Sequence, residues 1–357
     1  MDNLEYLLKL ADEAFNKQDY NKAIEYFDKL IFYYGDIIEL YNNRGLSKSS
    51  IGMYEEAIKD FEMVISMDPN YVHAYNNIGL VKHNLGHYEE AIKYYNKAIE
   101  IDSNCIQAYN NIGLSNYNLG NYEEAIKYYN KTIEISPNAH TYNNIGLIKN
   151  DLCMYEEAIE YFNKALELDK NYFKAYYNIG LSKYNLKIYD EALEYFNKAI
   201  KMDNNYVHAY NNIGIVKQDL GMYEESLEYF NKALKLSPYY SKGYYNRAVS
   251  KIKLEFYEEA IKDLNKSIEL DSKCSFSYQK RGEAKLKLKL YKEAAEDLLK
   301  SIELGNSNED IYFNIGFSYY KLSYFKDALY YFNKVHNNKK VNMLKTISKI
   351  KSIFIKK

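Results

Sequence analysis

The sequence contains no tryptophan, only 3 prolines and only 3 cysteines, and it has no long apolar run. A membrane-spanning helix needs about 20 consecutive apolar residues, so integral membrane association is not expected. The cysteine count is odd, and no metal-ligand spacing relates Cys105, Cys153 and Cys274. We therefore expect free thiols, no metal site and a cytoplasmic location.

The chain also lacks a large net charge, because 47 Lys and Arg residues nearly balance 49 Asp and Glu residues. Without a basic field, a nucleic-acid partner is not expected. The first residues, Met1 to Glu5, lack the basic and apolar segments of a signal peptide. No phosphate-binding glycine loop, nucleophile elbow or ligand cluster is present, so we expect a non-enzymatic protein without a cofactor.

The feature that dominates the chain is an internal repeat. The string Tyr75-Asn-Asn-Ile-Gly-Leu80 returns unchanged at 109–114 and at 142–147. Its small residue recurs every 34 residues, except that the step from Gly113 to Gly146 is one residue shorter. The small residues are Ala11, Gly45, Gly79, Gly113, Gly146, Gly180, Gly214, Ala248, Gly282 and Gly316. This periodicity predicts ten copies of one structural unit and no second domain.

Each copy has the pattern of two amphipathic helices. In the third copy, Tyr75, Ile78 and Leu85 form one apolar stripe, and Ala91 and Tyr95 belong to a second stripe after a turn. All 3 prolines fall between copies, where proline does not interrupt a helix. We therefore expect a helix-turn-helix unit in every copy.

This pattern resembles the tetratricopeptide repeat (TPR) family over nearly the whole chain. A large aromatic (Tyr75), an apolar-Gly pair (Ile78-Gly79), and then Tyr88, Ala91, Tyr95 and Ala98 follow the family spacing. The resemblance implies an all-α, right-handed α-solenoid superhelix of ten repeats, residues 1–342, followed by a C-terminal capping helix at 343–357. The expected repeats are about 4–37, 38–71, 72–105, 106–138, 139–172, 173–206, 207–240, 241–274, 275–308 and 309–342.

Two positions vary together among the repeats. The residue before the small one is Arg in only three repeats, and a position in the second helix is Asp in the same three. The pairs are Arg44 with Asp60, Arg247 with Asp263, and Arg281 with Asp297. Elsewhere an apolar residue accompanies Tyr, as with Ile78 and Tyr94. We expect each Arg to contact its own Asp as a structural ion pair, although descent of the three repeats from one ancestral subtype also explains the pattern.

Lysines occupy one position of the first helix in seven repeats. These are Lys48, Lys82, Lys149, Lys183, Lys217, Lys251 and Lys285. We expect their aliphatic stems to lie along the helix and their ammonium groups to stay in water.

Amides and aliphatic residues recur on the other face of the first helices, which the family resemblance places on the concave side. The amides are Asn42, Asn43, Asn76, Asn77, Asn110, Asn111, Asn143, Asn144, Asn178, Asn211 and Asn212. Leu80, Leu114, Leu147 and Leu181 accompany them, and His73, His140 and His208 are expected on the same face. An amide both donates and accepts, so it can pair with any peptide unit. We predict a groove that binds a protein or an extended peptide.

The C-terminus is the asymmetric part of the chain. No acid follows Asp327, whereas eight lysines follow from Lys334 to Lys357. The apolar stripe of the expected capping helix is Met343, Leu344, Ile347, Ile350 and Phe354. A basic amphipathic helix can also lie on an anionic membrane, which remains an alternative for this segment. Two further alternatives for the whole chain are a self-assembling scaffold, such as a homo-oligomer, and an accessory subunit of a separate enzyme.

Overall fold

The computed structural model describes residues 2–35, 37–336 and 339–354, and within these ranges the regular structure is α-helical. The first helices of the repeats are α1 (Asp2–Asn16), α3 (Ile38–Ser50), α5 (Val72–Asn84), α7 (Ile106–Asn118), α9 (Ala139–Asp151), α11 (Phe173–Asn185), α13 (Val207–Asp219), α15 (Ser241–Lys253), α17 (Ser275–Lys287) and α19 (Glu309–Lys321). The second helices are α2 (Tyr20–Tyr34), α4 (Tyr54–Met67), α6 (Tyr88–Ile101), α8 (Tyr122–Ile135), α10 (Tyr155–Leu168), α12 (Tyr189–Met202), α14 (Tyr223–Leu236), α16 (Tyr257–Leu270), α18 (Tyr291–Glu303) and α20 (Phe325–Phe332). The last helix is α21 (Lys339–Phe354).

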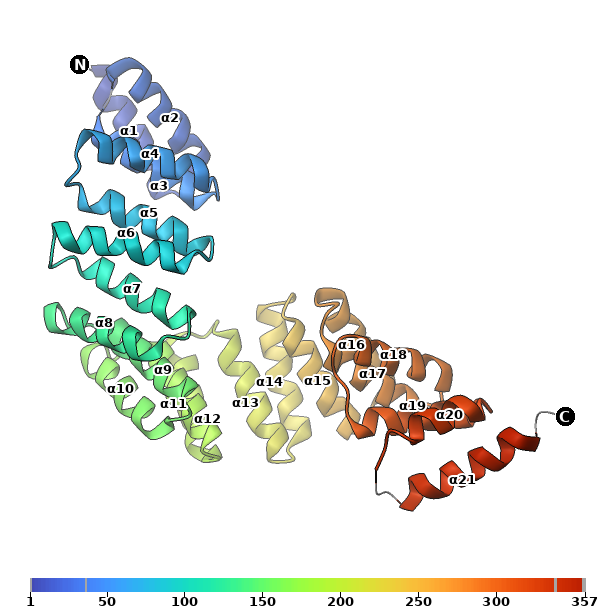
Figure 1. The fold of residues 1–357 in the computed structure, drawn as a ribbon. Helices are drawn as coiled ribbons and strands as arrows, with labels where there is room; N and C mark the ends of the chain where they lie inside the picture. Colours follow the sequence, from blue (N-terminus) through green and yellow to red (C-terminus); the bar gives the residue numbers. More distant parts are fainter. Residues whose placement is uncertain (1, 36, 337–338, 355–357) are drawn as a thin grey trace. The chain divides into compact units, whose positions relative to one another are not determined.

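The chain divides into two compact units, Met1–Asn178 and Ile179–Lys357, with the boundary inside α11. In the first unit, each first helix packs on its own second helix, and the second helix packs on the next first helix, as α5, α6 and α7 show (Figure 1). The second unit repeats this order from α12 to α20. Each unit is therefore a stack of helix pairs, and the predicted all-α repeat solenoid is confirmed.

A left-handed residue closes the turn inside every repeat. Within the described residues these are Gln18, Gly52, Gly86, Gly120, Cys153, Lys187, Gly221, Glu255, Lys289 and Ser323, each with φ between 59° and 82°. Glycine adopts this conformation without strain, but six of the ten residues carry a Cβ. The turn geometry is thus kept even where the favourable residue is absent.

The core of a repeat forms where the small residue of the first helix meets a large side chain of the second. A Cβ added to Gly146 would lie 2.5 Å from the ring of Phe162, and both residues are buried. In the eighth repeat Ala248 stands at the glycine position, and Leu264 replaces the ring. The glycines therefore set the close approach of the paired helices.

The C-terminal helix covers the last repeat. Leu344 of α21 is buried in one cluster with Phe332 and Val335, and Lys345 Nζ donates to the Val335 carbonyl over 3.1 Å. The predicted boundary at residue 343 falls inside α21, because the apolar spacing begins one turn after the backbone helix starts at Lys339.

Several features predicted for the C-terminus lie outside the described residues. The side chains of Met343, Ile350 and Phe354 belong to this group, as do residues 355–357. Ile347 of the expected apolar stripe is half-buried.

Two further observations concern membranes and metals. Among the helices in the described ranges, none has both the length and the apolar character that crossing a bilayer requires. In the same part of the chain, His, Cys, Asp and Glu side chains form no group of three or more suited to a metal ion.

Candidate functional site

The three arginines each contact the aspartate of their own repeat. Arg247 donates through Nε to Asp263 Oδ2 over 2.8 Å and through Nη2 to Oδ1 over 2.5 Å. Arg44 with Asp60 and Arg281 with Asp297 repeat this two-point geometry at 2.6–2.9 Å. The Asp263 side chain is only 7% exposed, so the fork of the guanidinium neutralises a nearly buried carboxylate.

A lysine completes each of these pairs, which corrects the expectation that the ammonium groups stay in water. Lys48, Lys251 and Lys285 lie 2.7–2.8 Å from the second oxygen of the same aspartates. In repeats without the aspartate, the lysine contacts a glutamate of the second helix instead, and Lys82 with Glu90 is an example at 2.8 Å. These carboxylates lie within reach because the second helix, which carries them, packs against the first helix, which carries the lysine.

Amide side chains of successive first helices hydrogen-bond to each other, and we call each such bond a rung. An Asn at the second amide position donates through Nδ2 to Oδ1 of an Asn at the first amide position of the preceding repeat, over 2.8–3.1 Å. The rungs join Asn77 to Asn42, Asn111 to Asn76, Asn178 to Asn143, and Asn246 to Asn211.

The rungs change the interpretation of the predicted amide groove. Asn42, Asn143, Asn178 and Asn211 are only 3–9% exposed. Asn43, Asn76, Asn77, Asn110, Asn111, Asn144 and Asn212 are half-buried. Because several of these amides bond to one another, they hold neighbouring first helices together, a role that the sequence analysis did not assign to them.

One rung is missing, at the step that is one residue shorter. Asn144, the expected donor, instead hydrogen-bonds through Nδ2 to Nδ1 of His140 in its own helix, over 3.2 Å. Asn110 Oδ1, the expected acceptor, is buried without a hydrogen-bond partner. Burial raises the pKa of Tyr129, and a hydrogen bond with Asn144 opposes that rise. The rung is therefore absent at the step where the repeat is one residue shorter.

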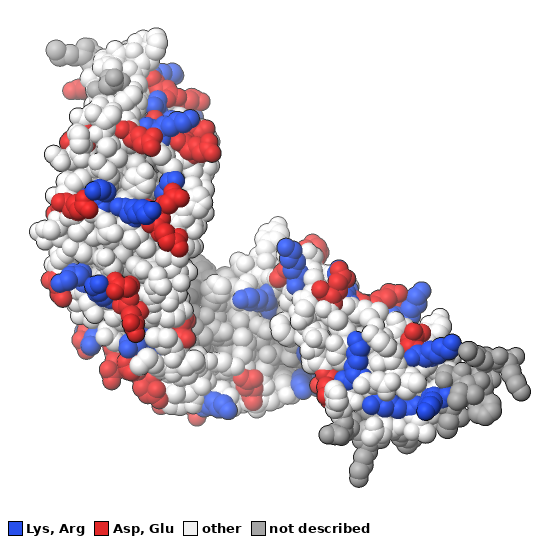
Figure 2. Space-filling model, in the orientation of Figure 1, with Lys and Arg blue, Asp and Glu red and all other residues white. Residues whose placement is uncertain are grey.

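The aliphatic residues lie on the same surface, which we call the first-helix face. Leu80 is 37% exposed, whereas Leu114, Leu147 and Leu181 are half-buried. They leave apolar surface on the first helices that carry the rungs, and their part in a groove stays a prediction. On the side of the first unit shown in Figure 2, lysines and acids are interspersed rather than gathered by sign.

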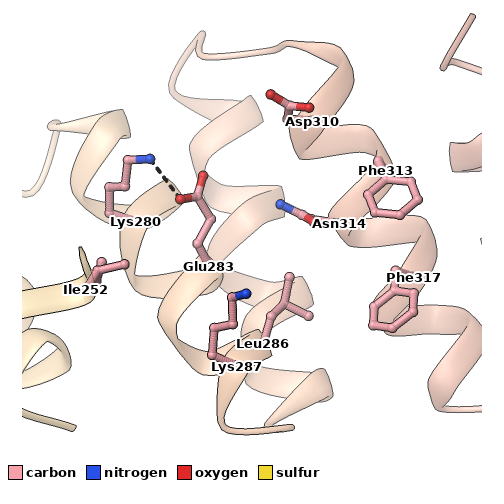
Figure 3. A pocket seen from close by; sticks show the side chains of 9 residues that line it. All are labelled: Ile252, Lys280, Glu283, Leu286, Lys287, Asp310, Phe313, Asn314 and Phe317. Atoms are coloured by element: carbon pink, nitrogen blue, oxygen red, sulfur yellow. Dashed lines mark hydrogen bonds and ion pairs between the residues drawn. The ribbon is translucent and has the colours of Figure 1, made fainter. Parts of the chain in front are cut away.

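A pocket opens on the first-helix face of the second unit, between α15, α17 and α19, with a volume of about 590 Å³. Phe313 and Phe317 form one wall, with their ring centroids 6.1 Å apart. The opposite side carries Lys280, whose Nζ lies 2.8 Å from Glu283 (Figure 3). The pocket thus combines an aromatic wall with charges of both signs.

The remaining residues that line this pocket are Ile252, Leu286, Lys287, Asp310 and Asn314. The sequence analysis missed the site. Its signal is the loss of the amide pattern, because Phe313 stands where five earlier repeats carry the first-position asparagine.

Comparison with known proteins places the sequence among repeat proteins. Family models described as tetratricopeptide repeat match residues 4–31, 38–71, 72–105, 104–171, 137–205, 172–238 and 241–274. No curated protein sequence matches the chain.

Several solved structures are similar. The APC/C hetero-tetramer Cut9-Hcn1 is 14% identical, with 97% of this chain and 96% of that one covered and a TM-score of 0.51. Yeast Tom70 is 15% identical, with 99% and 96% covered and a TM-score of 0.48. YrrB, titled a TPR protein with an unusual peptide-binding site, is 26% identical, with 50% and 92% covered and a TM-score of 0.39. Cut9-Hcn1 supports the fold.

Proposed function

The chain belongs to the tetratricopeptide repeat family, and we propose that it is a non-enzymatic scaffold whose first-helix face binds an extended peptide segment of a partner protein. Proteins built from stacked repeats present long continuous surfaces, which suit an elongated ligand. The proposal keeps the predicted class of partner but changes the residues that carry the contact.

The observation that carries the proposal is the pocket between α15, α17 and α19. Its aromatic wall, Phe313 and Phe317, offers apolar area for a large side chain of the peptide. Lys287 and Asp310, both exposed, lie at the same site and can pair with charges flanking that side chain. A peptide with an apolar anchor between charged residues fits this arrangement.

The rungs give the proposed surface its rigidity. An asparagine in a rung uses one of its two N–H donors or one of its two lone pairs, so further hydrogen-bonding capacity remains. Asn76, Asn77 and Asn111 are half-buried and retain surface for a ligand. We therefore place the apolar contacts on Leu80 and its equivalents, and give the amides a supporting role.

Charge reversal in the pocket tests this function. A peptide selected from a displayed random-sequence library for binding to the wild-type chain serves as the probe. Lys287→Glu and Asp310→Lys change exposed residues, so the fold should persist, and each should weaken binding by at least about tenfold. Fluorescence anisotropy with the labelled peptide measures the loss.

The matched control is Lys262→Glu, which makes the same charge change on an exposed residue of the second helix α16. It should leave the affinity unchanged. Equal losses in Lys287→Glu and Lys262→Glu would show that net charge, not the pocket, governs binding. If the wild-type chain selects no peptide and instead sediments as a defined oligomer, the self-assembling scaffold becomes the better proposal.

A further inference from the structure

The missing rung creates a site that no other described repeat shows. Asn110 Oδ1 is a buried acceptor without a donor, and a pocket of about 260 Å³ lies beside the residue. The pocket is lined by Gln107 and Asn110 of α7, Thr132 of α8, and Thr141 and His140 of α9, together with Ile106 and Asn138. We propose that Asn110 and this pocket bind a backbone N–H of an extended peptide, which supplies the donor that Asn144 no longer offers. The inference rests on the proposed function and assigns the first unit a peptide contact of its own.

The unsatisfied Asn110 acceptor carries an energetic cost. A buried polar group without a partner is rare in native proteins and unfavourable relative to one that is hydrogen-bonded. Asn42, Asn76 and Asn143 occupy the same position in neighbouring repeats of the first unit, and each accepts a hydrogen bond from another asparagine. Asn110 therefore has the geometry of an acceptor whose internal donor has been withdrawn.

The two threonine hydroxyls that line the pocket already donate hydrogen bonds within the protein. Thr132 donates its hydroxyl to the Tyr128 carbonyl over 3.3 Å, and Thr141 donates to Asn138 Oδ1 over 3.0 Å. Both hydroxyl protons are thus committed within the protein. The hydroxyl oxygens keep free lone pairs, so a ligand that contributes an N–H donor complements these lining residues.

The pocket offers no counter-ion for a charged ligand. The residues that line the pocket include no Lys, Arg, Asp or Glu. Burial and the neighbouring Lys174 lower the pKa of His140, which favours a neutral ring at pH 7. A cationic donor such as an ammonium group would find no counter-ion here and would lose its hydration. A neutral peptide N–H meets no such penalty.

The test couples one atom of the ligand to one residue of the protein. A peptide selected from a displayed random-sequence library is N-methylated at each backbone amide in turn and measured against the wild-type chain and Asn110→Ala. At one position, methylation should weaken wild-type binding by about threefold to tenfold, the range for a single hydrogen bond. The same methylation should have no effect on Asn110→Ala, because the acceptor is already gone.

Two variants separate binding from folding. Asn110→Ala removes an oxygen that holds no internal hydrogen bond, so its melting temperature should not fall. Asn76→Ala removes the acceptor of the rung from Asn111, so its melting temperature should fall. Insertion of one alanine between Pro137 and Asn138 restores the 34-residue step, and we expect it to restore the rung. This insertion should abolish the methylation effect.

Each outcome decides the matter. Methylation effects that are equal in the wild-type chain and in Asn110→Ala would overturn the site while leaving the pocket of the second unit untouched. A peptide whose binding is weakened by Lys287→Glu but by no methylation would also overturn the Asn110 site and leave the second-unit pocket untouched. If no peptide is selected at all, the proposed function fails, and this inference fails with it.

Discussion

The ring of Tyr95 lies directly against Gly79, where an added Cβ would be 2.5 Å from the ring atom Cε1. Five other glycines of the first helices meet a phenylalanine in the same way, namely Gly45, Gly146, Gly180, Gly214 and Gly316. The hydroxyl of Tyr95 is an addition to this contact, and it is buried without a hydrogen-bond partner. Close packing has been kept here at the expense of one unsatisfied polar group.

The first prediction follows from this hydroxyl. Tyr95→Phe should raise the free energy of unfolding by about 1 kcal/mol, because a buried, unpaired hydroxyl is removed and the ring remains. Tyr129→Phe is the matched control, since the Tyr129 hydroxyl is not a buried, unpaired group and its loss should bring no gain. Urea unfolding of both variants measures the difference. A Tyr95→Phe variant less stable than the wild-type chain would mean that the hydroxyl has a partner in solution.

A second prediction concerns the pair of Arg247 and Asp263. Asp263→Ala should destabilise the fold by about 3 kcal/mol, because it leaves the cations of Arg247 and Lys251 facing a site that no longer holds a carboxylate. Thermal and urea unfolding measure the loss. A variant that unfolds like the wild-type chain would show that solvent replaces the carboxylate without cost.

The matched control is the double variant Arg247→Ile with Asp263→Tyr. It copies Ile213 and Tyr229, the residues at the equivalent positions of the preceding repeat. Stability should return to near that of the wild-type chain, because well-packed apolar residues replace a buried ion pair with little loss. Lys251 should then contact Glu259, as Lys217 contacts Glu225 in that repeat.

A third prediction uses the left-handed turns. Lys187 has φ 61°, whereas Gly221 stands at the same turn position one repeat later. Lys187→Gly should stabilise the chain by about 1 kcal/mol, because a residue with a Cβ is strained in this region. Lys183→Gly, in the interior of α11, is the control and should destabilise. Differential scanning calorimetry compares the two, and a loss of stability in Lys187→Gly would contradict the strain argument.

The fourth prediction is a pH dependence. Burial raises the pKa of Tyr245 to about 12 from an ordinary value of 10.0. A raised folded-state pKa means that the folded chain retains this proton longer than the unfolded chain does. The contribution to stability is therefore complete below pH 10 and is lost as pH rises from 10 toward 12. Tyr245→Phe should flatten the fall in stability over that interval by about 1.4 kcal/mol per pH unit. Equal slopes in the variant and the wild-type chain would contradict the shift.

The sequence predicts the fold because the same pattern of apolar, small and turn residues recurs in every repeat. It also pairs Arg44 with Asp60, since two charged positions change together within one chain. The contact of Lys48 with the same aspartate leaves no such mark, because lysine stands at that position whether or not the aspartate is present. Only the structure shows which carboxylate each lysine contacts.

The rungs escaped prediction for a related physical reason. Asparagine occupies both positions in several successive repeats, so the residue types do not reveal that Asn77 bonds to Asn42 of the preceding repeat. The shorter step before Gly146 is visible in the sequence, but its effect on Asn144 depends on how the helices pack. The pocket beside Phe313 likewise depends on the space left when an amide is replaced by a ring.

The rungs also have a direction. In each, the later repeat gives the hydrogen and the earlier repeat receives it. Their small dipoles therefore add along a stack instead of cancelling. An extended strand beside the rungs would meet a different arrangement of dipoles in each of its two chain directions. For the proposed peptide ligand, this direction means that a peptide and the same residues in reverse order would not be interchangeable.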